Sequence, residues 1–272
     1  MPKFLFWNLN KREIPGFVRH VADEADADVL ILAECSMARE RLLEELNHDR
    51  RAGTDQYQYA WGTCDHLLFY TRFDGGFLRP LFESNRVSVR RLSLPARQPI
   101  IVAAAHLPSK MGFSENSQIF ESIQLSRMID DVEGSEGHHR TVLLGDFNMN
   151  PFEAGMVGAH GGLNAVMSRH VAARDTRTVQ GEKCKFFYNP MWSHLGDRAE
   201  TGGTFFYDHA EPVCYFWNMY DQVLLRPDLL EGFAPDHVQI LTSVRGVSLL
   251  QDGRPDREMA SDHLPVLVEL NF

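Results

Sequence analysis

Short runs of consecutive aliphatic residues are the feature that most constrains how this chain folds. Asp28 to Ala33 contains one such run, and Thr141 to Leu144 forms another. Both runs are too short for an ordinary helix, so they predict strands that are buried on two faces. We therefore expect these strands to lie inside a layered structure, with other elements packed against both sides of the sheet.

Helical patterns alternate with the predicted strands at the start and in the middle of the chain. Lys3 to Asn8 has an extended pattern, residues 13–25 have helical periodicity, and the first aliphatic run follows. A second helix is expected over about Met37 to Asn47. Residues 116–133 place apolar side chains near helical spacing just before the strand at Thr141 to Leu144. These passages predict β-α-β units.

The remaining segments are rich in strand-like runs. Residues 57–106 contain several of them, separated by turn signals, whereas residues 154–170 favour one or two short helices. Long crossovers combined with hairpins predict an α+β fold of two packed sheets with helices outside them. Further strands are expected at Phe205 to Tyr207, Tyr220 to Leu225, Val238 to Thr242 and Leu264 to Leu270.

The composition is that of an ordinary globular protein, with 44% hydrophobic and 24% charged residues. Because neither an internal repeat nor a Ser, Gly or Pro-rich linker divides the chain, we expect one domain over residues 1–272. No apolar run approaches the roughly 18 residues of a membrane-spanning helix. The start of the chain does not resemble a signal peptide and the four cysteines are scattered, which predicts a cytoplasmic protein with reduced thiols.

Polar side chains that can bind metals or transfer protons stand at the ends of the predicted strands. Strands that each end in a carboxylate, an amide or an imidazole can bring these groups to one edge of a sheet pair. We therefore expect a single site. The residues concerned are Asn8, Glu34, His106, Asp146, Asn148, Asp221, Asp262 and His263.

These residue types suit metal-assisted hydrolysis. Mg²⁺ prefers oxygen ligands and is usually held by one or two carboxylates together with a substrate phosphate, so Glu34 with Asp146 or Asp262 would suffice. His263 can transfer a proton near neutral pH. A neighbouring carboxylate, for which we nominate Asp221, would fix the tautomer of His263 and stabilise its charged form. Neutral amides can orient water or a phosphate oxygen without adding charge.

Each motif also has a plainer structural explanation when it is taken alone. The GDFN sequence around Asp146 could be a strand followed by an Asx turn, and the Ser-Asp-His step could be a helix cap or a loop. Glu34 could cap the next helix, and Asn8 could be a turn residue. It is their joint occurrence at the ends or starts of buried strands that favours the functional interpretation.

The ordered set of motifs FWNLN, LAE, HLPSK, GDFNMNP, YDQVL and SDHLPV resembles the endonuclease/exonuclease/phosphatase superfamily. The similarity runs from Asn8 to Val266, nearly the whole chain. It implies a four-layer sandwich of two packed, mainly antiparallel β-sheets flanked by helices, with metal and phosphate held at one edge. It also implies Mg²⁺-dependent hydrolysis of phosphoesters, with Mn²⁺ as a substitute metal.

The resemblance implies a role for each residue that holds the metal and the phosphate. Glu34 would be the principal metal ligand. Asn8 and Asp262 would lie near the ion, and Asn8 would also belong to the catalytic set. Asn148 would position the scissile phosphate.

The resemblance also implies how the reaction proceeds. Asp146 would orient or deprotonate the attacking water, and His263, paired with Asp221, would bind the phosphate and stabilise the developing charge. The base is Asp146 or His263, and we favour Asp146. His106 resembles the histidine of pancreatic-type deoxyribonucleases, inositol-phosphate phosphatases and sphingomyelinases, whereas abasic-site endonucleases commonly have a tyrosine in this region. A structural histidine at a strand end is the alternative.

Signals for substrate binding are concentrated before the Asp221 strand. Residues 174–198 carry five cations and three anions, a charge of +2 in a chain of −10. We expect an irregular substrate loop in this segment. Aromatic residues at 205–207 and 215–217 could stack on bases, although core packing explains them equally well. The candidate substrate-binding residues are Lys110, Lys185, Tyr188, Trp192 and Arg198.

Together these patterns predict a Mg²⁺-dependent phosphodiesterase, and first of all a nuclease that acts on DNA or RNA. The net charge of −10 argues against non-specific wrapping of nucleic acid, but it does not exclude a nuclease, because a bound cation reverses the local charge. Two alternatives stay open. The first is a phosphatase or phosphodiesterase for a small-molecule or phospholipid phosphoester, and the second is a non-catalytic binding module that keeps the fold.

Overall fold

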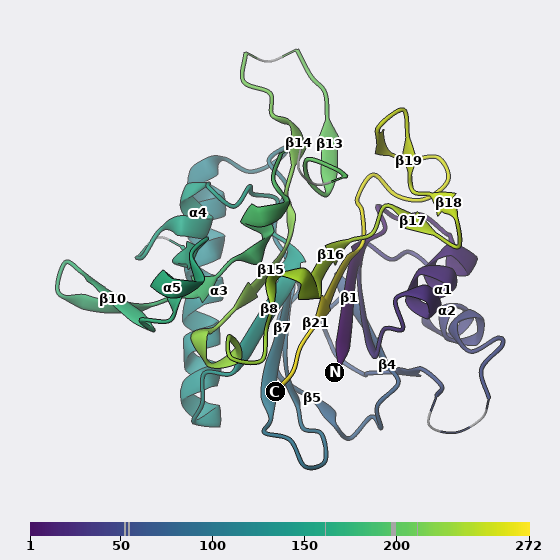
Figure 1. The fold of residues 1–272 in the computed structure, drawn as a ribbon, viewed down its shortest axis with the longest axis horizontal. Coiled ribbons are helices and arrows are strands. Elements are labelled where there is room, and N and C mark those ends of the chain that lie inside the picture. Colours follow the sequence, from purple (N-terminus) through teal and green to yellow (C-terminus); the bar gives the residue numbers. More distant parts are fainter. Residues whose placement is uncertain (52, 54, 161, 197–199, 211) are drawn as a thin grey trace.

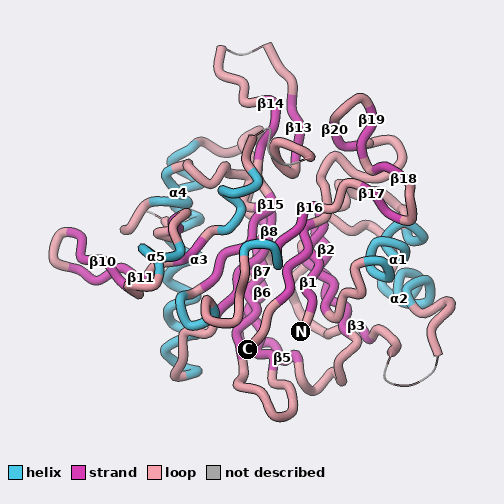
Figure 2. Tube along the Cα trace, viewed as in Figure 1, coloured by secondary structure: helices cyan, strands magenta, loops and turns pink. Residues whose placement is uncertain are grey.

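The computed structural model describes residues 1–51, 53, 55–160, 162–196, 200–210 and 212–272. Two large mixed β-sheets lie face to face, and helices cover their outer faces (Figure 1). The view by secondary structure shows the strands gathered in the middle and the helices at the two sides (Figure 2). The expected α+β sandwich of two packed, mainly antiparallel sheets flanked by helices is confirmed.

Sheet A contains the first two strands of the chain. Its strands β1 and β2 are parallel, and its other pairings among the described residues are antiparallel. In spatial order the sheet consists of β16 (Val238–Ile240), β21 (Val266–Glu269), β1 (Lys3–Asn8), β2 (Val29–Ala33), β4 (Leu67–Thr71) and β3 (Gln58–Tyr59).

Sheet B contains the strands from the middle of the chain. Its central strands β7 and β8 are parallel, as are its edge strands β12 and β9, whereas β15 runs antiparallel to β8. In spatial order the sheet consists of β5 (Leu78–Glu83), β6 (Val87–Leu92), β7 (Ile100–His106), β8 (Thr141–Asp146), β15 (Asp221–Leu225), β12 (Phe187–Tyr188) and β9 (Ala165–Val166).

Helices and short ribbons complete the described fold, and no described helix combines the length and apolar character needed to cross a membrane. The helices are α1 (Pro15–Glu24), α2 (Arg39–Leu46), α3 (Glu115–Glu136), α4 (Ala154–Val157) and α5 (Arg169–Ala172), with 3₁₀ turns η1 (Pro190–His194), η2 (Pro227–Leu229) and η3 (Pro235–His237). The ribbons are β10 (Thr176–Val179) with β11 (Glu182–Lys185), β13 (Phe205–Tyr207) with β14 (Phe216–Asn218), β17 (Ser243–Val244) with β18 (Val247–Ser248), and β19 (Leu250–Gln251) with β20 (Arg254–Pro255).

Strand β1 shows why the aliphatic runs are buried on both faces. Phe4 and Phe6 belong to the apolar core between the two sheets. Leu5 and Trp7, which alternate with them, pack with the buried side chains of α1 and α2 on the outer face of sheet A. Because successive side chains of a strand point to opposite faces, an inner strand of a four-layer sandwich must be apolar at every position.

Helix α3 covers the outer face of sheet B and is held by a cap at each end. The Ser114 hydroxyl accepts a hydrogen bond from the backbone N–H of Ser117, and Gly137 ends the helix in the left-handed conformation. These caps satisfy backbone groups that lack partners at helix ends. Leu125 and Ile129 of α3 pack in an apolar cluster with Ile101 and Leu143 of sheet B, so the helical spacing expected within residues 116–133 is present.

The segment expected to be an irregular loop contains a regular hairpin instead. Val179 pairs with Glu182, and the two residues between them, Gln180 and Gly181, both have positive φ values of 50° and 88°. A two-residue turn with this backbone joins antiparallel strands with the correct twist. The expectation of an irregular segment was therefore wrong for β10 and β11, because Gln-Gly is a weaker turn signal than Asn-Gly.

A buried charge cluster links α3 to sheet B. Glu133 is fully buried, and its carboxylate accepts hydrogen bonds from Arg226 Nε at 2.8 Å, Thr141 Oγ1 at 2.8 Å and Lys185 Nζ at 3.0 Å. Burial acts to raise the pKa of Glu133, but Arg226, Thr141 and Lys185 outweigh it and hold that pKa below its usual value. The guanidinium also lies 3.9 Å from the centroid of the Phe187 ring.

Glu133→Gln is expected to lower the free energy of unfolding by about 3–5 kcal/mol at neutral pH, because it removes the buried charged partner of Arg226 and Lys185 and leaves them only the more exposed Asp130. A lowered pKa in the folded state stabilises the protein fully above the unfolded-state pKa of Glu and progressively less as pH falls below it. The difference in the free energy of unfolding between wild type and variant should therefore shrink below about pH 4.5. Urea unfolding at several pH values measures this difference. Asp131→Asn, an exposed change on the same helix, is the control.

Candidate active site

The predicted site residues meet at one edge of the sandwich because two pairs of parallel strands end there. In sheet A, Asn8 at the end of β1 lies opposite Ala33 at the end of β2, so Glu34 follows at the same edge. In sheet B, His106 at the end of β7 lies opposite Asp146 at the end of β8. Parallel neighbouring strands bring their carboxyl ends to one side of a sheet.

The two sheets are joined at this edge through the Asp146 carboxylate. Oδ2 of Asp146 accepts a hydrogen bond of 2.9 Å from the side-chain amide of Asn8, and Oδ1 accepts one of 2.8 Å from the backbone N–H of Asn148. Asp146 is 1% exposed. Asn148 itself has a left-handed φ of 52°, and its side-chain amide donates to the Leu107 carbonyl at 2.9 Å. Both carboxylate oxygens of Asp146 are thus fixed in direction.

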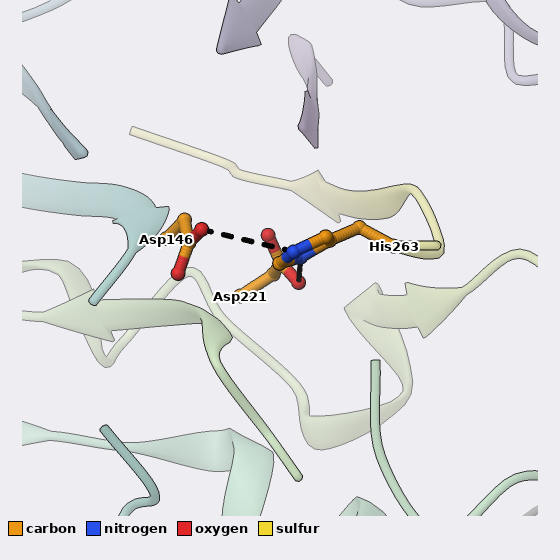
Figure 3. Close-up of side chains that lie close together, drawn as sticks. All are labelled: Asp146, Asp221 and His263. Carbon is orange, nitrogen blue, oxygen red and sulfur yellow. Dashed lines mark hydrogen bonds and ion pairs between the residues drawn. The ribbon is translucent and has the colours of Figure 1, made fainter. Parts of the chain in front are cut away.

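His263 and Asp221 form a buried hydrogen-bonded pair beside Asp146. Nδ1 of His263 lies 2.7 Å from Oδ2 of Asp221, and Nε2 of His263 lies 3.9 Å from Oδ2 of Asp146 (Figure 3). The three groups lie close enough to share a metal ion. Because the His263–Asp221 contact is already a short hydrogen bond, the arrangement is better explained as a carboxylate that orients an imidazole toward Asp146.

The two histidines of the site have opposite pKa shifts. Burial acts to lower the pKa of His263, but the carboxylates of Asp221 and Asp146 outweigh it and raise that pKa well above its usual range. Burial raises the pKa of Asp221 to about 6, against the opposing effect of His263, so Asp221 is ionised at neutral pH. Burial lowers the pKa of His106, although Asp146 and Glu34 act in the opposite direction. His263 is therefore the charged imidazole and His106 the neutral one.

The oxygen donors at this edge fit a divalent cation. Glu34 and Asp146 both lie near Nε2 of His106, at 3.4 Å and 3.8 Å. Among the described residues, Oδ1 of Asp262 is buried without a hydrogen-bond partner. A buried carboxylate oxygen without a partner is costly, and a hard cation would satisfy it. Glu34 also has a left-handed φ of 47°, a conformation that is uncommon for residues other than glycine.

The candidate substrate-binding residues occupy different places. Lys110 is exposed near the site, with its Nζ 2.5 Å from Glu153 and 5.5 Å from the centroid of the Tyr220 ring. Lys185 is paired with Asp130 and Glu133 under α3. Tyr188 is 4% exposed, so its ring cannot stack on a base. Trp192 is partly exposed and lies beside Phe152. Arg198 lies outside the described residues.

Several residues that support the site were not found from the sequence. The Ser261 hydroxyl donates to the Asn8 carbonyl at 2.7 Å, which ties the loop before His263 to the end of β1. The Trp7 indole donates to the His263 carbonyl at 2.9 Å. The pairing of Leu67 with Ala33 places His66 across from Glu34, and its ring centroid lies 5.6 Å from that of His106. The sequence does not show that His66 is near the site, because the pairing of β4 with β2 is what brings it there.

The sequence profile of the Endonuclease/Exonuclease/phosphatase family matches residues 5–263, and the chain belongs to this family. Its members are phosphoester hydrolases that depend on a divalent metal, so this protein is an enzyme of that class. None of the curated protein sequences compared with the chain matches it.

Solved structures of low sequence identity share the fold. A family protein from Bacteroides thetaiotaomicron is 14% identical, with a TM-score of 0.60 over 99% of this chain and 94% of that one. TDP2 from D. rerio complexed with a single-strand DNA product is 15% identical, with a TM-score of 0.57 over 100% and 99%. The 3′ phosphatase NExo from Neisseria, bound to a product DNA hairpin, is 14% identical, with a TM-score of 0.57 over 100% of both chains.

Gly145 permits the close approach of β7 and β8 on which the site depends. It pairs with Ala105 and directly precedes Asp146. A Cβ atom at Gly145 would lie 2.0 Å from the Ala105 carbonyl oxygen, a backbone atom that cannot move without displacing β7. His106 and Asp146, the next pair in the register, would shift with it.

Gly145→Ala should therefore lower the free energy of unfolding by about 1–3 kcal/mol or more, as expected for overpacking, and should also reduce activity in the fraction that folds. Chemical denaturation and activity per folded molecule measure the two effects. The matched control is Gly134→Ala in α3, where a Cβ meets nothing within 4 Å. That change should stabilise the protein by about 0.5–1 kcal/mol. Equal behaviour of the two variants would contradict the close-approach argument.

Proposed function

We propose that this protein is a Mg²⁺-dependent nuclease that hydrolyses phosphodiester bonds of DNA or RNA by in-line attack of an activated water. The observation that carries the proposal is the direct hydrogen bond of Asn8 to Asp146, with Nε2 of His263 3.9 Å from the same carboxylate and Nδ1 of His263 hydrogen-bonded to Asp221. This arrangement places a fixed base and a charged hydrogen-bond donor close together, so that both can act on one phosphate group. A base for the attacking water and a donor to the phosphate oxygens are two groups by which a protein accelerates hydrolysis of a phosphodiester.

Asp146 is the proposed base. Its oxygens accept hydrogen bonds from Asn8 and Asn148, which fix the direction of the carboxylate and leave lone pairs free for a water molecule. His263, kept protonated by Asp221 and Asp146, donates from Nε2 to a non-bridging oxygen of the phosphate. Asn148 positions the scissile phosphate. His106 is neutral and can donate or accept one hydrogen bond at the same edge.

Glu34 and Asp262 are the proposed metal ligands, with Asn8 close by. A bound Mg²⁺, or Mn²⁺ in its place, would neutralise charge on the phosphate and the leaving group. The donor set consists of oxygens, which suits these ions better than zinc. Binding of a cation also offsets the negative charge of the carboxylates where a phosphate must approach.

Nucleic acid is the proposed substrate. In support, the TDP2 and NExo structures that share the fold are described as bound to DNA products. Phosphatase or phosphodiesterase action on a small-molecule or phospholipid phosphoester is the alternative, which the histidine at position 106 favoured from the sequence. A single domain over residues 1–272 and a cytoplasmic location stay predictions from the sequence.

An activity panel with Mg²⁺ tests the proposal. Wild-type protein should cleave DNA or RNA, and Asp146→Asn and His263→Ala should each lower kcat by about 10²–10⁴, the range of a lost acid or base. Asp236→Asn, an exposed change outside the site, should leave kcat unaltered. No cleavage of any nucleic acid, with turnover of soluble phosphoesters, would reject the nuclease in favour of the alternative. Activity that survives both site variants would place the reaction elsewhere.

The role of Glu34 is tested by metal titration. Glu34→Gln keeps the shape of the side chain but removes a charged oxygen ligand, so the Mg²⁺ concentration for half-maximal activity should rise at least about tenfold. Isothermal titration of the free protein with Mn²⁺ should show the same loss of affinity without relying on catalysis. Glu40→Gln on α2 is the exposed control. An unchanged metal affinity would exclude Glu34 as a principal ligand.

A further inference from the structure

The first turn of α3 carries a buried glutamine whose side chain contacts two loops of the active-site edge. Gln118 is 1% exposed. Its Nε2 donates a hydrogen bond of 2.9 Å to the Asn148 carbonyl and one of 3.3 Å to the Pro108 carbonyl. A side-chain amide nitrogen has two hydrogens, so one glutamine can supply both bonds. Gln118 thus joins the loop that follows β7 to the loop that follows β8.

The two carbonyls that Gln118 contacts occupy equivalent places in these loops. His106 at the end of β7 lies opposite Asp146 at the end of β8, and this is the last pair in the parallel register. Pro108 comes two residues after His106, and Asn148 comes two residues after Asp146. Backbone pairing of β7 with β8 does not extend to these positions. The amide of Gln118 therefore links the two loops just beyond the point where the strands stop holding them.

The choice of glutamine at this position is explained by the two bonds that it donates. Both neighbours of Nε2 are carbonyl oxygens, which only accept, so the nitrogen of the amide must face them. Oε1 of Gln118 is buried without a hydrogen-bond partner among the described residues, and such burial is unfavourable. Leu125 and Ile129, further along the buried face of α3, are apolar. Packing against sheet B alone would favour an apolar residue here as well.

The bond from Gln118 completes the set of contacts that fix Asn148. This asparagine has a left-handed φ of 52°, which is uncommon for residues other than glycine. Its backbone N–H donates to Oδ1 of Asp146 at 2.8 Å, and its side-chain amide donates to the Leu107 carbonyl at 2.9 Å. Gln118 holds the carbonyl of the same residue. The second hydrogen of the Asn148 amide is left for the phosphate.

The next carbonyl of the loop is held in a similar way from another element. Nε2 of Gln222 in β15 donates to the Met149 carbonyl at 2.6 Å, and Oε1 of Gln222 accepts a hydrogen bond of 2.7 Å from Asn189. Gln222 and Asn189 are both buried. Two successive carbonyls that leave β8 are thus bonded to glutamines of α3 and β15. Gln118 is the glutamine of this pair that also contacts the loop after His106.

We propose that Gln118 is a positioning residue for the hydrolysis. By tying the loops after His106 and Asp146 together, it holds Asn148 where the asparagine amide meets the scissile phosphate. The proposal rests on the function proposed above and adds a residue on which that site depends. Gln118 does not touch the substrate itself, so it acts through the position of Asn148.

A double-mutant cycle with Mg²⁺ tests this role. Gln118→Met has a similar volume but no donor, and kcat should fall by about tenfold to a hundredfold, the scale of a small misplacement in an active site. In an Asn148→Ala background the same change should cause little further loss, because the group that Gln118 positions is gone, whereas in a His263→Ala background the full loss should persist. Gln124→Met, the same substitution at an exposed position of α3, should leave kcat unaltered.

Two results of the cycle would overturn the positioning role. One is an unaltered kcat in Gln118→Met, and the other is an equal loss of kcat in the Asn148→Ala and His263→Ala backgrounds. Gln118→Asn is the second variant if the methionine variant does not fold. It keeps an amide, but its side chain is one methylene shorter and cannot reach both carbonyls, so kcat should fall as well.

Hydrogen exchange of the free protein, followed by NMR, tests the position of Asn148 without catalysis. In Gln118→Met the backbone N–H of Asn148 should exchange about tenfold faster or more, the effect of losing one buried hydrogen bond. Leu143, which is paired on both sides within sheet B, should keep its rate. Equal acceleration at both residues would show a general loss of stability and would overturn the proposal.

The two measurements separate the positioning role from the nuclease function. If wild type cleaves no nucleic acid but turns over soluble phosphoesters, the nuclease function is rejected, and the cycle is run on those esters. If wild type cleaves nucleic acid and Gln118→Met does so equally well, the positioning role alone is rejected. Faster exchange at Asn148 together with a loss of kcat that disappears in the Asn148→Ala background supports the role.

Discussion

The apolar core between the two sheets is the constraint on which the rest of the structure depends. Phe4, Phe6 and Ile31 from sheet A meet Val102 and Leu144 from sheet B in this core. Since burial of apolar area is the main favourable term in folding, the core fixes how the two sheets face each other. Once they face each other in this way, the ends of β1 and β2 must lie beside the ends of β7 and β8. The active-site edge is a consequence of core packing.

Charge is used differently at this edge and under α3. At the site, carboxylates lie close together with few cations beside them. Binding of a divalent ion would relieve the repulsion between these carboxylates. Under α3, Glu133 is matched by Arg226 and Lys185, and every strong charge has a partner. The first arrangement suits a cation, while the second stabilises the fold. Lys185 therefore serves the fold, although its sequence context suggested a substrate contact.

The electrostatic asymmetry between His263 and His106 shows how position decides chemistry. Both imidazoles are buried and both lie within 4 Å of Asp146. His263 has a second carboxylate, Asp221, bonded to its other nitrogen, whereas the corresponding nitrogen of His106 has no partner among the described residues. A carboxylate on each side favours the charged form, and burial without such a partner favours the neutral form. Two identical side chains thus become a charged donor and a neutral one.

The sequence by itself determined the layers of the fold and predicted which polar residues end the strands that meet at one edge. Aliphatic runs buried on both faces required covering layers, and each run ended in a polar residue whose local context was visible, as for Glu34 and Asp146. The tertiary structure alone decided which groups touch, because contacts such as Trp7 with His263 join segments 256 residues apart. It also decided that Tyr188 is buried while Tyr207 is exposed. An aromatic side chain has the same local pattern in a core and on a surface, and only the packing of distant segments distinguishes them.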